Sequence, residues 1–174
     1  MSLSRLPGIV AVLWLMSAHL AAQGLVVPLE RAAELKRSYP FVRFLSLASF
    51  DLPLADGFVH SQPASRPTEP LVIPAEVLAL HGKASSIRGF MLPIDVTSAG
   101  VKTFILTSSI DSCHWGLTGL PNEWVLVEMN ARVPFLQFQP VTIFGRLSVE
   151  PSYRAGRLSG LYQMRGEFLS ADGL

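Results

Sequence analysis

The residues with the clearest chemical potential gather in one stretch of the chain, residues 108–123. It holds the only cysteine, Cys113, which is followed directly by His114, and Asp111 lies two positions before the cysteine. A thiolate and an imidazole are good ligands for zinc or copper, and a carboxylate such as Asp111 or Glu123 could add an oxygen ligand. One hypothesis is therefore a zinc or copper site on Cys113 and His114, with Asp111 as a weaker ligand.

The same pair of residues also has simpler interpretations. Cys113 could be buried as a small apolar group, with His114 hydrogen-bonded at the surface. A thiol redox role is a further alternative, but without a second cysteine a self-contained dithiol cycle is impossible. Nucleophilic catalysis by Cys113 needs a base, and adjacent side chains of an extended chain point to opposite faces. We therefore expect no enzyme.

The same loop carries side chains suited to binding. Trp115 and Trp124 could stack on a sugar, base or peptide, although core packing accounts for at least one of them equally well. The candidate residues for binding a ligand or partner are Cys113, His114, Trp115, Asn122 and Trp124. No phosphate-binding glycine loop, nucleotide fingerprint, nucleophile elbow or HExxH motif is present in the sequence, so ATP, nicotinamide and flavin chemistry have no support.

The elements that would position this loop are strands. Alternation of apolar and polar residues predicts strands at Ser85–Leu92, Val101–Thr107, Trp124–Met129, Val141–Glu150 and Arg157–Ser170. Glycines inside three of these strands, Gly89, Gly145 and Gly166, are typical of places where a strand bends or another backbone comes close. The sequence therefore predicts a mainly β protein with a small OB-like antiparallel barrel of about five strands.

An N-terminal arm of short helices precedes the barrel. Amphipathic spacing predicts a helix over Leu29–Arg37, and Pro74–Leu80 predicts one or two helical turns. The apolar segment Phe41–Phe50 could be a strand or a continuation of the arm. Five prolines between Leu52 and Pro74 indicate a long irregular connection.

The start of the chain resembles a secretory signal peptide. Arg5 precedes an apolar run, Ile9–Leu15, and small residues lead to a plausible cut near Ala22. The apolar stretch is shorter than the roughly 20 residues that a membrane span needs. We therefore expect a signal peptide over 1–22, an arm over 23–80 and an OB-like β domain over 81–174. The product would be periplasmic or secreted, with no stable membrane span after cleavage.

The charge balance argues against a nucleic-acid partner. Of 14 basic residues, Arg5 lies in the leader, so 13 remain against 13 acidic residues. A near-neutral mature protein lacks the basic field that attracts nucleic acid.

The second half of the chain resembles a family of secreted bacterial proteins, domain of unknown function 3299 (DUF3299). The matching stretches, in order, are Leu80–Lys83, Ile87–Pro93, Phe104–Leu106, Cys113–His114, Pro121–Trp124 and Val141–Gly145. The resemblance implies an exported single domain with an OB-like core and no assigned reaction; some members look like accessories to transport systems, with metals among the candidate cargoes. Many members continue the Cys-His segment with several prolines, whereas here only Pro121 follows.

We therefore expect an exported, non-enzymatic protein that binds a small ligand or an envelope transport complex through residues 108–123. The alternatives are a zinc or copper carrier or sensor that uses Cys113 and His114, and a thiol redox partner.

Overall fold

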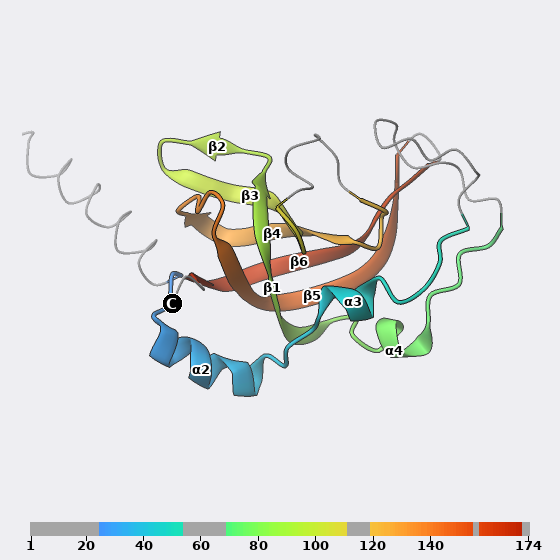
Figure 1. Cartoon of the computed structure of the whole chain (residues 1–174), viewed down its shortest axis with the longest axis horizontal. Coiled ribbons are helices and arrows are strands. Elements are labelled where there is room, and N and C mark those ends of the chain that lie inside the picture. The colour runs from blue at the N-terminus through green and yellow to red at the C-terminus, as the bar shows by residue number, and fades with distance from the viewer. Residues whose placement is uncertain (1–24, 54–68, 111–118, 155–156, 172–174) are drawn as a thin grey trace, which may run out of the picture.

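The computed structural model describes residues 25–53, 69–110, 119–154 and 157–171, and the predicted signal peptide lies outside them (Figure 1). The described chain is mainly β. Its strands are β1 (Lys83–Pro93), β2 (Val96–Thr97), β3 (Gly100–Thr107), β4 (Trp124–Val133), β5 (Pro140–Arg154) and β6 (Arg157–Ala171). Each of the five strands predicted from the sequence is present, and the short β2 was not predicted.

The five long strands pair in a ring. The sheet order is β1-β5-β6-β4-β3-β2, and a further pairing of β1 with β3 closes the circle. This confirms the OB-like prediction, with one correction: the sheet is mixed, because β4 and β6 run parallel while the other junctions of the ring are antiparallel. Strand directions cannot alternate all the way around a closed ring with an odd number of members, so one parallel junction is unavoidable.

The predicted role of the interior glycines is confirmed. At Gly89, strand β1 changes partner, since the next residue, Phe90, pairs with Pro140 of β5 and with Thr107 of β3. A Cβ atom at Gly89 would collide with the Thr107 carbonyl oxygen. Gly145 and Gly166 face each other across β5 and β6, next to a β-bulge. The strands can therefore bend and approach closely because these positions carry no side chain.

The interior of the ring holds the main hydrophobic core. Alternate residues of each strand point inward, as the period of two in the sequence predicts. Fully buried examples are Val125, Val127 and Met129 of β4, Val141, Ile143 and Leu147 of β5, and Leu158, Tyr162 and Met164 of β6.

Helix α2 (Leu29–Ser38) lies outside the ring, at the lower left of Figure 1, where the sequence predicted a helix. After α2, the ring of Tyr39 makes edge contacts with Phe144 and Phe168, and its hydroxyl donates a hydrogen bond of 2.6 Å to Glu167. Burial, followed by the bond to Glu167, raises the pKa of Tyr39 to about 12. The arm is thus attached to the outer face of β5 and β6 by an aromatic cluster.

The segment Phe41–Phe50 is mostly not a strand. Phe41 forms a single parallel bridge with Ser86, and the chain then turns into the short helix α3 (Phe44–Leu47). The later helix α4 (Ala75–Leu78) lies where one or two helical turns were predicted. Leu47 and Val77 are buried in the same hydrophobic cluster as the strands. None of the described helices is both long enough and apolar enough to cross a bilayer.

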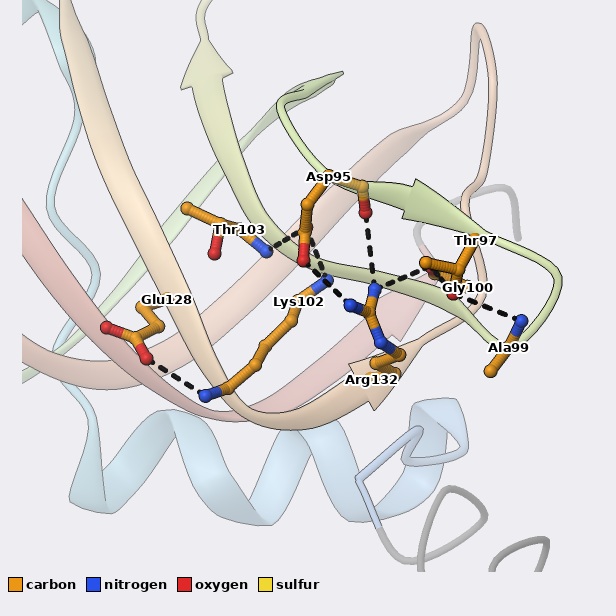
Figure 2. Close-up of polar contacts among 8 residues, drawn as sticks. All are labelled: Asp95, Thr97, Ala99, Gly100, Lys102, Thr103, Glu128 and Arg132. Carbon is orange, nitrogen blue, oxygen red and sulfur yellow. Dashed lines mark hydrogen bonds and ion pairs between the residues drawn. The ribbon is translucent and has the colours of Figure 1, made fainter.

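A polar cluster fixes the connection between β1 and β3. The Asp95 carboxylate accepts hydrogen bonds from the backbone N–H groups of Lys102 (3.0 Å) and Thr103 (2.7 Å). Figure 2 shows the Arg132 guanidinium beside Asp95 and Gly100; it pairs with the carboxylate at 3.0 Å and donates to the Gly100 carbonyl at 3.0 Å. These backbone bonds and then Arg132 hold the pKa of Asp95 below its usual value.

Candidate functional site

The described chain contains some of the candidate residues and not others. Asn122 and Trp124 are described, whereas Asp111, Cys113, His114 and Trp115 lie outside the described residues. Within the described ranges, no three His, Cys, Asp or Glu side chains come close enough to hold a metal ion. The zinc or copper site on Cys113 and His114 therefore stays a prediction.

A pocket of about 420 Å³ lies where residues 108–123 leave the ring and return to it. One wall is formed by α3 and the residue after it, and the other by the two ends of the loop. We call this cavity the α3 pocket; its lining residues are Phe44, Leu45, Ala48, Thr107, Ser108, Gly119 and Glu123.

Local hydrogen bonds shape the loop ends. Thr107, the last residue of β3, is buried, and its hydroxyl donates to the Ser109 carbonyl at 2.8 Å. On the returning side, the Glu123 N–H donates to the Leu120 carbonyl, and the Leu120 N–H donates to the Glu123 carboxylate at 2.7 Å. This reciprocal pair makes a tight turn that places the Glu123 carboxylate on the pocket wall.

Asn122 joins the loop to the arm. Its side chain is buried, with 2% of the residue exposed, and its amide Nδ2 donates to the Phe50 carbonyl at 2.8 Å. Its Oδ1 atom has no hydrogen-bond partner among the described residues. The geometry therefore gives Asn122 a positioning role, since it ties the two walls of the α3 pocket together.

Tyr162 supports the α3 wall from inside the ring. Its hydroxyl donates to the Leu47 carbonyl at 2.7 Å, and burial raises its pKa. Phe44 passes over the bend of β1, because a Cβ atom at Gly89 would lie 3.0 Å from its ring. These contacts attach α3 to the barrel at both of its ends.

Trp124 packs against the neighbouring strand. It opens β4 opposite Thr107, and its ring lies over Gly160 of β6, where a Cβ atom would be 2.5 Å from the indole Cη2. The tryptophan remains partly exposed. Packing on β6 is thus one role of Trp124, as the sequence allowed for at least one tryptophan.

The chemistry of the α3 pocket suits binding. The apolar residues Phe44, Leu45 and Ala48 line the α3 side, and on the loop side the described lining includes the polar residues Ser108 and Glu123. The sequence suggested Glu123 only as a possible metal ligand. It gave no signal for Phe44, because the pocket depends on a tertiary contact between α3 and a loop more than fifty positions later.

A solved structure resembles this chain along most of its length. The crystal structure of a DUF3299 family protein from Pseudomonas aeruginosa PAO1 matches it with a TM-score of 0.53 and 18% sequence identity, covering 78% of this chain and 97% of that one. The chain has the fold of a DUF3299 protein. The resemblance drawn from the sequence motifs therefore points to the same family as the fold does. No family model and no curated protein matches the sequence.

The first stretch on which the sequence resemblance was based has a structural role in this fold. In the stretch Leu80–Lys83, the His81 imidazole Nδ1 accepts a hydrogen bond of 3.3 Å from the Val149 backbone N–H. This bond lies just before Lys83, the first residue of β1, which pairs with Leu147 of β5. Gly82 has a φ of 71°, which favours glycine, and its N–H donates to the Leu147 carbonyl. The stretch Leu80–Lys83 thus starts the pairing of β1 with β5.

Proposed function

We propose that this protein is an exported, non-enzymatic binding protein that holds a small ligand or a segment of an envelope partner in the α3 pocket. The observation that carries the proposal is the pocket itself, which is lined in part by the described ends of the stretch 108–123 that the sequence singled out. Loops on a rigid barrel are frequent sites of binding, and OB-type barrels use their loops in this way.

The walls of the pocket support the same role. Hydrogen bonds from Asn122 to Phe50 and from Tyr162 to Leu47 fix α3 against the barrel. A site held in place before the ligand arrives loses less conformational entropy on binding, which favours affinity. The volume of about 420 Å³ falls in the range of about 300–1,000 Å³ that is common for small-molecule sites.

Binding in the α3 pocket is tested by filling it. Ala48 lines the pocket, so Ala48→Leu places new atoms in the cavity. Ser46 is an exposed residue of α3 that does not line the pocket, so Ser46→Leu is the matched control. A fragment library is screened by ligand-observed NMR against the full chain and both variants.

We expect fragments that bind the unchanged protein and the Ser46→Leu variant, and that lose binding in Ala48→Leu. If no fragment binds, or if Ala48→Leu binds the same fragments equally well, the proposed function is wrong.

Export is proposed from the N-terminal sequence, with its basic residue, apolar run and small residues before Ala22. Expression of the full chain with a C-terminal tag, followed by cell fractionation and mass measurement, tests it. We expect a periplasmic or secreted product that lacks about 22 residues. A full-length product retained in the cytoplasm would contradict export.

A second candidate function is zinc or copper carriage or sensing. Cys113 and His114 are adjacent in the sequence, and Asp111 could add an oxygen ligand. The metal content of protein purified without chelator, compared with that of Cys113→Ser, tests this candidate. Near-stoichiometric zinc or copper that is lost in the variant would favour it, and metal-free protein that takes up neither ion would exclude it.

A further inference from the structure

One charged group stands among the described residues that line the α3 pocket. In this described part of the lining, Glu123 is the only ionisable residue, and the others are apolar residues, two hydroxyl residues and a glycine. Within the described part of the chain, no lysine or arginine forms an ion pair with Glu123. The carboxylate thus remains available to a positively charged ligand group.

The position of this carboxylate is fixed. Its Oε2 atom accepts the Leu120 N–H at 2.7 Å, and the Glu123 backbone N–H closes the same turn on the Leu120 carbonyl. Because the Glu123 side chain is already held, it loses less conformational entropy when a ligand binds. A carboxylate held in this way is suited to accept a charge-assisted hydrogen bond.

The opposite wall suits an apolar group next to a cation. Phe44 and Leu45 line the α3 side, and Leu45 is 76% exposed, so it has surface that a ligand can cover. An aromatic ring also attracts cations through the negative charge of its face. A ligand carboxylate or phosphate, by contrast, would find no cation among the lining residues that the structure describes and would be repelled by Glu123.

We infer that the α3 pocket binds a small protonated amine attached to an apolar group, with Glu123 as the counter-ion and Phe44 and Leu45 as the apolar contacts. The inference rests on the proposed function, since it names the class of ligand for the same pocket.

The test compares three probes of nearly the same shape: 2-phenylethylamine, 2-phenylethanol and phenylacetate. Their binding to the full chain is measured by NMR titration. The variant Glu123→Gln removes the charge but keeps an oxygen that can accept the Leu120 N–H. Glu128→Gln is the matched control, because Glu128 is an exposed carboxylate of β4 that pairs with Lys102 and does not line the pocket.

We expect the amine to bind at least about tenfold more tightly than the alcohol or the carboxylate, since hydrogen bonds to charged groups contribute more than neutral ones. Glu123→Gln should weaken amine binding about tenfold and leave alcohol binding unchanged, while Glu128→Gln should alter neither.

Two results would overturn the inference. If the alcohol binds as tightly as the amine, or if Glu123→Gln leaves amine binding unchanged, the ligand class is wrong while the pocket remains a binding site. If none of the probes binds, the ligand class is also wrong, and the fragment screen with Ala48→Leu decides separately whether the pocket binds anything.

Discussion

At the scale of single residues, the polar side chains around the α3 pocket connect segments that are far apart in the sequence. Asn122 reaches a carbonyl 72 residues earlier, and Tyr162 reaches one 115 residues earlier. Each satisfies a carbonyl near the short helix α3, which at four residues has little intrinsic stability. The conformation of α3 therefore depends on these long-range bonds.

The first prediction concerns Asn122→Ala. The change leaves the Phe50 carbonyl without its partner, so the free energy of unfolding should fall by about 1 kcal/mol. The Ala48 N–H, which donates to the Phe44 carbonyl, should exchange its hydrogen faster because α3 opens more often. Thermal unfolding and amide hydrogen exchange measure the two effects. Asn130→Ala, at an exposed position of β4, is the control and should change neither.

The second prediction concerns Asp95, whose pKa is lowered mainly by two backbone hydrogen bonds and then by Arg132. A lowered pKa in the folded state stabilises the protein above the ordinary value of 3.8, and this contribution is lost as the pH falls below it. Asp95→Asn removes the charge but keeps an oxygen for the backbone bonds.

The Tm of the unchanged protein should therefore exceed that of Asp95→Asn at neutral pH, and the difference should shrink as the pH falls from about 5 to about 2. Thermal unfolding of both proteins across this range measures the difference. A gap in Tm that stays constant with pH would show that the charge of Asp95 does not contribute as described.

At the scale of the strands, close packing of backbones gives the ring its curvature. Gly145 provides the third prediction, because a Cβ atom there would overlap the Arg165 carbonyl of β6. Gly145→Ala should force the strands apart and lower the free energy of unfolding by about 3 kcal/mol. Denaturant unfolding measures this change.

Gly82→Ala separates this packing effect from the cost of backbone conformation. Gly82 has a φ of 71°, but a Cβ atom there would meet nothing within 4 Å. Its substitution should therefore cost only about 1 kcal/mol, the usual penalty for a left-handed alanine. Equal losses in the two variants would mean that close approach of β5 and β6 is not what requires Gly145.

The sequence predicted the strands well and their pairing less well. Alternation marks a strand because one face of it is buried, and this holds wherever the strand lies in the sheet. Which strand pairs with which is decided by ring closure, so the parallel junction of β4 and β6 left no local pattern. Helix α3 was missed for a similar reason: the segment Phe41–Phe50 is mostly apolar, and only its docking on the barrel decides which residues turn inward.

The site that the sequence suggested stays a prediction. The sequence drew attention to residues 108–123, and Ser108, Gly119 and Glu123 from the described ends of this stretch line the α3 pocket. Cys113, His114 and Trp115 lie outside the described residues, and Asn122 proves to be a connector between loop and arm. Phe44 and Leu45 could not be associated with this loop from the sequence, because they come from α3.

At the scale of the whole molecule, the arm and the ring share one hydrophobic core. Leu47 of α3 is 0% exposed and belongs to the same cluster as residues of all five long strands, among them Val127 of β4. Main-chain hydrogen bonds between the arm and β1 add to this attachment: the Val42 N–H donates to the Ser86 carbonyl, and the Ser86 N–H donates to the Pro40 carbonyl. The arm and the barrel should therefore unfold as one cooperative unit.

The last prediction tests this coupling with Leu47→Ala. Removing a buried leucine side chain should lower the free energy of unfolding by about 3 kcal/mol and leave a single transition. Leu45→Ala is the matched control two residues earlier in α3, and because Leu45 is 76% exposed the change should cost no more than about 0.5 kcal/mol. If arm and ring are one unit, the Val127 N–H deep in β4 must exchange faster in Leu47→Ala by a factor that matches the lost stability. Unchanged exchange at Val127, with faster exchange confined to α3, would instead mean that the arm opens on its own while the ring stays folded.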